Sequence, residues 1–231
     1  MRTIVVIPAR WESTRLPGKP LALIGDKPMI QHTWERASQS ITDEVIVATD
    51  SQLVFDTVIG FGGQAILTGD CSTGTERVVE VQKLKRADFV INVQGDEPFI
   101  EPKDIDNVIK TVNAFPEFII TLKTNLIDNE PTDPNTVKVI TDKSGNVVMF
   151  TRSSVYAEAN FVFKHIGIYG YSAANLDIIS NAKPTESSIS NSLEQLTWMD
   201  NSISMLAGFT NYKSFGIDTP SDLERANKMY K

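Results

Sequence analysis

A loop near the start of the chain carries side chains that bind polyanions. A short apolar run at residues 4–7 is followed by three cations and two hydroxyls, with one glycine among them: Arg10, Ser13, Thr14, Arg15, Gly18 and Lys19. Arginine suits phosphate because its planar fork donates bidentately to phosphate oxygens, and lysine adds a point charge. A solvated basic turn is the alternative, but the position directly after a buried strand weighs against it. The pattern therefore predicts phosphate binding.

The Gly18-Lys19 pair invites comparison with a nucleotide P-loop, and the comparison fails. A P-loop needs Ser or Thr after the lysine to meet Mg²⁺, whereas Pro20 follows Lys19 here. The three spaced glycines of a dinucleotide-binding fingerprint are also absent after the first strand. Phosphate must then be held mainly by side chains, with help from a few backbone amides.

Two acidic positions fit metal binding. Asp96 lies in Gln94-Gly-Asp-Glu-Pro98, at the end of a predicted buried strand. Mg²⁺ is commonly held by one or two carboxylates together with substrate phosphates and waters. Gly95 would let a ligand approach Asp96, although an Asx-turn would use the same residue. Asp218 is the second acid, and its spacing alone favours a helix-opening residue.

Other candidates have a structural interpretation beside the functional one. Arg77 lies one turn into a helix that starts near Gly74, where free amides attract anions, but a solvated helix start fits equally well. His165 precedes a strand, and a lone histidine is more often structural than catalytic. Glu194 and Gln195 lie within a predicted helix, and on spacing alone they fit surface positions.

The composition excludes several classes of function. The chain has 231 residues, 41% of them hydrophobic, which suits one soluble α/β domain. The formal net charge of −7 argues against duplex nucleic acid as a partner, because binding its backbone needs a basic surface. Cys71 is the single cysteine, so no intrachain disulfide can form, and we do not expect a thiol nucleophile. We find no signal peptide and no membrane-spanning run, so we expect a cytoplasmic protein with no membrane partner.

Strands and helices alternate along the first hundred residues. Continuous apolar, β-branched runs predict buried strands at residues 4–7 and 44–50, and we expect further strands at residues 64–68 and 89–94. Helical spacing predicts helices at residues 28–40, 51–59 and 75–87. Short connections between such elements are typical of crossover units on a parallel sheet. Because ligands bind beyond the carboxyl ends of parallel strands, we expect residues 10–19, 49–50 and 94–98 to meet in one crevice.

The second half of the chain predicts a smaller antiparallel portion. After a helix at residues 103–114 we expect strands that alternate like half-exposed ones, at residues 118–122, 137–140 and 147–150. A strand at residues 165–171 contains two glycines, which suggests close approach by a ligand or another chain. The remaining predicted elements are helices at residues 173–181 and 190–199, a strand at 203–206, and a last helix that opens at Thr219.

Together these motifs resemble the 3-deoxy-manno-octulosonate cytidylyltransferases, also called CMP-Kdo synthetases. The resemblance covers nearly the whole chain in the same order. Its segments are Pro8-Ala-Arg-Trp-Glu-Ser-Thr-Arg-Leu-Pro-Gly-Lys-Pro-Leu21, Ala48-Thr-Asp50, Gly74-Thr-Glu-Arg77, Asn92-Val-Gln-Gly-Asp-Glu-Pro98, Pro134-Asn-Thr-Val-Lys138, His165-Ile-Gly-Ile-Tyr-Gly-Tyr171, Leu193-Glu-Gln-Leu196 and Gly216-Ile-Asp-Thr-Pro220. Acylneuraminate cytidylyltransferases are similar only in the looser loop pattern.

The resemblance implies a fold and a reaction. The fold is α/β, with a mostly parallel central sheet of the Rossmann-like nucleotidyltransferase type and a smaller antiparallel portion. The protein would be an enzyme, usually a homodimer, that uses CTP and Mg²⁺ to make a CMP-sugar and pyrophosphate for lipopolysaccharide biosynthesis. We expect one domain, residues 1–231, with a CTP-binding portion at 1–125, a sugar-binding and dimer portion at 126–215, and the metal residue and C-terminal helix at 216–231.

The resemblance also implies a role for each candidate residue. The CTP triphosphate would be held by Arg10, Ser13, Arg15 and Lys19. The cytosine and ribose would lie against Ala9, Arg77 and Gln94. Mg²⁺ would bind Asp96 and Asp218, which are predicted catalytic residues together with Arg10 and Lys19. The sugar acid would face His165, Tyr169, Glu194 and Gln195.

Departures from the family pattern lie on the sugar or dimer side. Lys164, Ser172 and Thr197 stand where arginine is common, residues 185–192 lack the usual further glutamates, and the segment 152–163 is shorter than usual. A site with fewer arginines and more acid would suit a cationic sugar. We therefore expect transfer to Kdo or to a close analogue such as 8-amino-3,8-dideoxy-manno-octulosonate. The alternatives are acylneuraminate activation and a non-catalytic CTP-binding protein.

Overall fold

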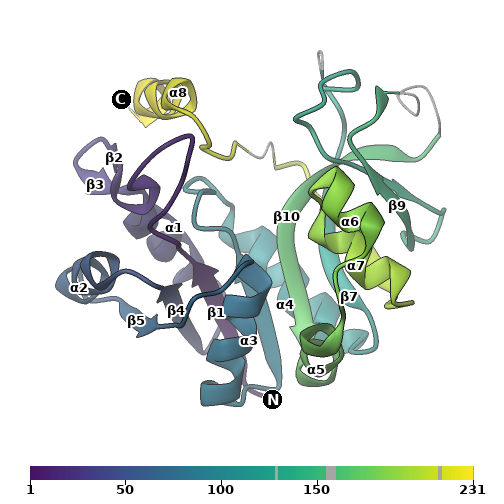
Figure 1. Ribbon diagram of the computed structural model, residues 1–231, viewed down its shortest axis with the longest axis horizontal. Coiled ribbons are helices and arrows are strands. Elements are labelled where there is room, and N and C mark those ends of the chain that lie inside the picture. The colour runs from purple at the N-terminus through teal and green to yellow at the C-terminus, as the bar shows by residue number, and fades with distance from the viewer. Residues whose placement is uncertain (128–129, 155–159, 213–214, 231) are drawn as a thin grey trace.

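Among residues 1–127, 130–154, 160–212 and 215–230, which the computed structural model describes, nine strands form one central sheet (Figure 1). Its main path runs β11–β7–β10–β6–β1–β4–β5, and β8 and β9 extend it from β10. The strands are β1 (Thr3–Pro8), β4 (Glu44–Thr49), β5 (Gln64–Leu67), β6 (Phe89–Val93), β7 (Ile119–Thr124), β8 (Lys138–Thr141), β9 (Val147–Thr151), β10 (Val162–Ser172) and β11 (Met205–Phe209). A short hairpin, β2 (Leu23–Ile24) and β3 (Lys27–Pro28), forms a separate sheet.

Helices cover both faces of the central sheet. One face carries α1 (Met29–Ala37), α2 (Gln52–Gly60) and α4 (Pro102–Ala114). The other carries α3 (Gly74–Lys85), α5 (Ala173–Asn181) and α7 (Glu194–Asp200), with α6 (Glu186–Asn191) packed on α7. The last helix, α8 (Pro220–Tyr230), lies beside the β2–β3 hairpin, where Asn227 Nδ2 donates to the Leu23 carbonyl at 3.0 Å (Figure 1).

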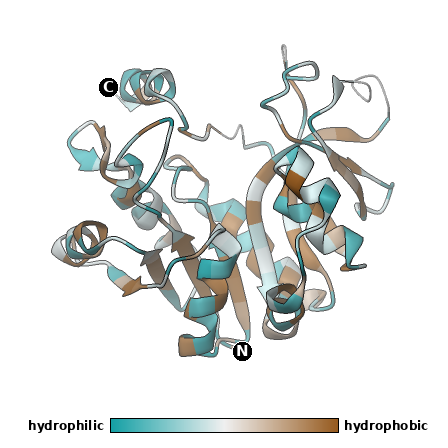
Figure 2. Ribbon diagram, viewed as in Figure 1, coloured by the Kyte–Doolittle hydropathy of each residue, from teal (hydrophilic) through white to brown (hydrophobic). Residues whose placement is uncertain are grey.

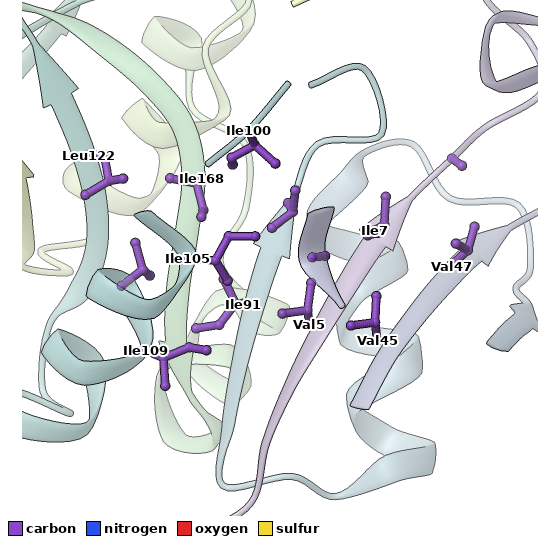
Figure 3. Close-up of a cluster of buried hydrophobic side chains, with 14 of the residues drawn as sticks. Val5, Ile7, Val45, Val47, Ile91, Ile100, Ile105, Ile109, Leu122 and Ile168 are labelled. Carbon is purple, nitrogen blue, oxygen red and sulfur yellow. The ribbon is translucent and has the colours of Figure 1, made fainter. Parts of the chain in front are cut away.

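Alternate side chains of each central strand enter opposite halves of the core. In β1, Val5 and Ile7 belong to the cluster under α1, α2 and α4, and Ile4 and Val6 belong to the cluster under α3, α5 and α7. Figure 3 shows the first cluster, which extends across the sheet from β4 to β7. Figure 2 shows hydrophobic strands between helices of mixed colour. Burial on both faces explains why these strands are apolar at consecutive positions.

The pairing pattern confirms the predicted fold class. β1 pairs in parallel with β4 and β6, β4 with β5, and β11 with β7. β10 runs antiparallel between β6 and β7, and its first residues pair with β8. The long β10 thus joins the parallel part to the antiparallel part in one continuous sheet. The division into three functional portions stays a prediction, and residues 128–129, 155–159, 213–214 and 231 lie outside the described part of the chain.

The helix predicted at residues 190–199 is instead two helices, α6 and α7. Ser192 between them has φ of +51°, in the left-handed region, and Leu193 is extended. Leu193 and Trp198 are both buried in the same apolar cluster. Positions five apart on one continuous helix point about 140° away from each other. The break therefore lets both side chains reach the core.

The prediction of a half-exposed strand at 118–122 is wrong, because every residue of β7 is buried. β11 comes from far along the chain and covers what would otherwise be the edge of the sheet. Gly170 in β10 also has a reason other than a ligand. A Cβ there would lie 2.7 Å from Val108 Cγ1, so helix α4 is what approaches the backbone.

This contact predicts that Gly170→Ala destabilises the protein by about 1–3 kcal/mol, because the methyl group overpacks a filled core. The measurement is the free energy of unfolding in urea. Gly60→Ala is the matched control, since a Cβ at that helical position meets nothing within 4 Å. Equal stability of the two variants would show that α4 moves aside freely.

Candidate active site

A cavity of about 530 Å³ opens beyond the carboxyl ends of β1 and β6. Ten of the predicted site residues line it: Ala9, Arg10, Ser13, Arg15, Lys19, Arg77, Gln94, Asp96, Glu194 and Asp218. The loop after β1 and the segment after β6 therefore meet in one crevice, as the topology predicts. The third predicted contributor, Asp50, stands outside this lining and reaches the site through the side chains that it holds.

The loop after β1 is fixed at several points along its length. The Ala9 amide donates to the Ala48 carbonyl at 2.8 Å, and the Trp11 amide donates to Asp50 Oδ1 at 3.0 Å. Ser13 Oγ accepts from the Leu16 amide at 3.4 Å. Gly18 has φ of +65°, a conformation that glycine adopts without strain. These contacts hold the basic loop in place, and the loop forms one wall of the cavity.

Lys19 lies between the two predicted metal ligands. Its Nζ is 2.6 Å from Asp96 Oδ2 and 2.8 Å from Asp218 Oδ1, and Arg15 reaches the same Asp218 oxygen at 3.1 Å. Burial disfavours the charge on Lys19, but the two carboxylates outweigh it and raise the pKa of the ammonium. Burial also works against the charge on Asp218, and Lys19 and Arg15 still lower the pKa of its carboxyl. Lys19 and Asp218 are therefore charged near neutral pH.

The position of Asp218 rules out the helix-opening role that spacing favoured. Asp222 Oδ2 accepts from the amides of Thr219 and Asp218, at 2.9 Å and 3.2 Å, and so caps the start of α8. The Asp218 carboxylate is left to face the cavity. Asp96 likewise directs its carboxylate at Lys19, with its carbonyl accepting from the Ile217 amide at 3.0 Å.

The pair Asp96 and Asp218 fits a divalent cation that arrives with phosphate. Both carboxylates converge on one point, the position that Lys19 Nζ fills. Within the described residues, no group of three or more His, Cys, Asp and Glu could hold a metal. A cation here would take its remaining ligands from phosphate and water, which is how Mg²⁺ is commonly bound.

Arg77 lies almost fully buried at the back of the cavity. Its Nη2 donates to Asp50 Oδ2 at 2.8 Å, and its Nη1 donates to Thr68 Oγ1 and, at 3.5 Å, to the Gly69 carbonyl. Thr73 caps this helix by accepting from the Glu76 amide at 3.1 Å. These contacts fix the orientation of the Arg77 guanidinium.

Three of the predicted sugar residues lie behind the cavity rather than on it. His165, Tyr169 and Gln195 are each less than 9% exposed, between β10 and α7. The His165 and Tyr169 rings lie 5.6 Å apart. Glu194 is the sugar candidate that reaches the cavity, and its Oε2 accepts from Thr75 Oγ1 at 2.9 Å. Burial raises the pKa of the Glu194 carboxyl. The roles of all four residues stay predictions.

Some lining residues were missed by the sequence reasoning. Ser72, Thr73 and Ser192 contribute hydroxyls to the cavity. Thr73 could have been found, because Thr followed three residues later by Glu is the signature of a helix start. Ser192 could not, since its place depends on the break between α6 and α7.

Comparison with known proteins identifies the family. Residues 4–206 match the family model described as cytidylyltransferase. A 3-deoxy-manno-octulosonate cytidylyltransferase of Thermodesulfovibrio yellowstonii is 42% identical, over 99% of this chain and 98% of the relative. The chain belongs to the 3-deoxy-manno-octulosonate cytidylyltransferase family. A member from Pelobacter propionicus is 38% identical, over 100% of this chain and 98% of the relative. The predicted membership of this nucleotidyltransferase family is confirmed.

Comparison with solved structures supports this family assignment. The structure of a CMP:2-keto-3-deoxy-manno-octonic acid synthetase complexed with CTP is 39% identical, with a TM-score of 0.94, over 99% of this chain and 98% of that one. A cytidylyltransferase from Leptospira borgpetersenii, at 18% identity and a TM-score of 0.67, shares the fold. Over the described part of the chain, we find no helix with the length and apolar character that a membrane span requires.

The surroundings of His165 predict a pH dependence of stability. Its Nε2 lies 3.0 Å from Thr121 Oγ1, its ring packs edge-on against Phe150, and burial lowers its pKa to about 3. Below pH 6.5 the unfolded state takes up a proton that the folded state refuses, so stability falls as the pH drops toward 3.

We expect His165→Asn to remove this contribution. The urea unfolding free energy of the variant should fall less steeply between pH 6 and 4 than that of the wild type, by up to about 1.4 kcal/mol per pH unit. Parallel pH profiles of the two proteins would contradict a neutral, buried His165.

Proposed function

We propose that this protein transfers a cytidylyl group from CTP to the anomeric hydroxyl of 3-deoxy-manno-octulosonate (Kdo) or a close analogue, and releases pyrophosphate. The product would supply lipopolysaccharide biosynthesis. One observation carries the proposal. Arg10, Arg15 and Lys19 meet Asp96 and Asp218 around one cavity, in a chain 39% identical to a synthetase solved with CTP.

The phosphate end of CTP would lie along the loop after β1. Arg10, Arg15 and Lys19 supply cations for the triphosphate, and the Ser13 hydroxyl adds a neutral donor. To reach phosphate, Lys19 must exchange its two carboxylate partners for phosphate oxygens. A divalent cation held by Asp96 and Asp218 would offset the negative charge of the triphosphate.

The reaction needs positioning more than covalent chemistry. The anomeric hydroxyl gives its proton to solvent water and forms a bond to the α-phosphorus, while the bond from that phosphorus to the pyrophosphate oxygen breaks and pyrophosphate leaves with the bonding electrons. Cations along the loop stabilise the charge that develops on the leaving pyrophosphate. The base and ribose would lie against Ala9, Arg77 and Gln94, which line the cavity beside this loop. No covalent intermediate is required, and burial raises the pKa of the Cys71 thiol to about 11, which makes it a poor nucleophile.

The sugar acid would bind on the side of Glu194. A second cavity, of about 590 Å³, shares Cys71, Thr73, Ser192 and Glu194 with the first. Its lining also includes the carboxylates of Asp70, Glu76 and Glu80 and the ammonium of Lys83. These carboxylates support an amino-bearing analogue, such as 8-amino-3,8-dideoxy-manno-octulosonate, as a candidate substrate in addition to Kdo. His165, Tyr169 and Gln195 would contact the sugar only after β10 and α7 shift.

A pyrophosphate-release assay with CTP and Mg²⁺ tests the proposal over three sugar acids. The panel is Kdo, its 8-amino analogue and N-acetylneuraminate. We expect turnover with one of the two octulosonates, and a higher kcat/KM for the amino form supports the acidic subsite. Turnover with N-acetylneuraminate alone would favour acylneuraminate activation. CTP binding without turnover of any acid would favour a non-catalytic protein.

The metal site makes a sharper prediction. Asp96→Asn removes a charge while keeping the shape of the side chain, so we expect at least a 100-fold loss of Mg²⁺-dependent turnover, roughly the effect of losing a key charged group in a catalytic site. Glu224→Gln on exposed α8 is the control and should keep wild-type activity. Pyrophosphate release by Asp96→Asn at close to the wild-type rate would refute the role of Asp96.

We also propose that the protein forms a homodimer. Strands β9 and β11 and the turn before β10 expose apolar side chains that a second copy could cover, among them Val148, Phe161 and Phe209. Size-exclusion chromatography with light scattering measures the mass directly. A monomer mass at assay concentration would contradict this proposal without affecting the assigned reaction.

A further inference from the structure

We propose that Asp50 is a positioning residue for CTP, which orients both the loop 10–19 and the Arg77 guanidinium. The inference rests on the proposed function, since it concerns how this chain would hold the nucleotide. Asp50 directly follows β4, its side chain is 33% exposed, and it does not line the 530 Å³ cavity, although it contacts Arg77, which does. It therefore acts through its neighbours rather than by touching the substrate.

The two oxygens of Asp50 bind two different parts of the site. Oδ1 accepts from the Trp11 amide at 3.0 Å, and Oδ2 accepts from Arg77 Nη2 at 2.8 Å. One rigid, planar carboxylate thus links the loop after β1 to helix α3. A hydrogen bond to an ionised group is stronger than a neutral one, so both contacts resist displacement.

Trp11 links the Asp50 carboxylate to the part of the loop that precedes Lys19. Its ring lies over Gly18, where an added Cβ would be only 3.1 Å from the ring. Gly18 precedes Lys19 and has φ of +65°, which lets the chain turn under the indole. The amide held by Asp50 and the ring resting on Gly18 belong to the same residue. Asp50 therefore sets the spacing between the start of the loop and its phosphate-binding lysine.

Arg77 is oriented by the same carboxylate. Its side chain is 3% exposed, and its Nη1 and Nη2 donate to three acceptors: Asp50 Oδ2, Thr68 Oγ1 and the Gly69 carbonyl. A guanidinium has five donors, so donors remain for a ligand in the cavity. Asp50 also neutralises the Arg77 charge. Arg77 then offers directed donors with little net charge, which suits the neutral acceptors of a base or ribose.

Two substitutions separate these contacts. Asp50→Ala removes both, and we expect KM and Kd for CTP to rise by about 10- to 100-fold, the usual effect of losing a charged hydrogen-bonding partner. Asp50→Asn keeps its one oxygen for the Trp11 amide and turns its NH2 donor toward Arg77, so its KM and Kd should lie between those of wild type and Asp50→Ala. In both variants KM for the sugar acid should stay within about 3-fold of wild type.

Asp43→Ala is the matched control. Asp43 lies just before the other end of β4, and its Oδ2 accepts from the Thr3 amide at 2.8 Å. Its loss removes a carboxylate–amide bond of the same kind, away from the cavity. We expect Asp43→Ala to lower the urea unfolding free energy while leaving KM and Kd for CTP unchanged.

The outcomes separate the two proposals. Calorimetry on the wild-type chain tests CTP binding itself, and no binding would end the proposed function. Wild-type binding with an unchanged Kd in Asp50→Ala would overturn the role of Asp50 alone. Wild-type behaviour of Asp50→Asn beside a weakened Asp50→Ala would overturn the link to Arg77. Equal losses of CTP affinity in Asp43→Ala and Asp50→Ala would show that Asp50 contributes to the stability of the fold and does not position CTP.

Discussion

The Lys19 ammonium, held between the Asp96 and Asp218 carboxylates, joins three parts of the chain that the sheet alone would leave separate. Asp96 is 77 residues from Lys19, and Asp218 is 199 residues away. Beneath these charges lies a small apolar cluster that includes Leu16 and Ile217, one from the loop and one from the segment before α8. The charges are compensated only when all three segments are in place. The cavity therefore exists because the two ends of the chain meet.

This arrangement also restricts what can enter. A phosphate that takes Lys19 leaves two carboxylates beside its own negative charge, and they repel it. A phosphate that arrives with a divalent cation supplies each carboxylate with a new partner as Lys19 turns to phosphate. On the proposed function, the charge balance of the site would favour a nucleotide bound together with its metal over either one alone. This preference follows from the short distances between the Lys19 ammonium and the Asp96 and Asp218 carboxylates, and from the opposite signs of their charges.

The sequence was most informative where local pattern and topology agree. Runs such as residues 4–7 and 89–94 predicted buried parallel strands. Because ligands bind beyond the carboxyl ends of such strands, the sequence also predicted that residues 10–19 and 94–98 meet in one crevice. Contacts between distant segments were out of reach. β7 is buried because β11 pairs with it, Gly170 is small because α4 crosses it, and Asp218 is free of the helix start because Asp222 caps it. No local pattern reports such partners.

The two ends of the cavity differ in how charge is used. Arg10, Arg15 and Lys19 line one end of the cavity in a chain of net charge −7, so positive charge is gathered there locally rather than over the whole surface. At the other end Asp50 pairs with the Arg77 guanidinium and offsets its charge. On the proposed function, a polyanion would be drawn to the first end, while Arg77 at the other would distinguish neutral hydrogen-bonding edges. A nucleoside triphosphate has this same division, with its charge at one end and its base at the other.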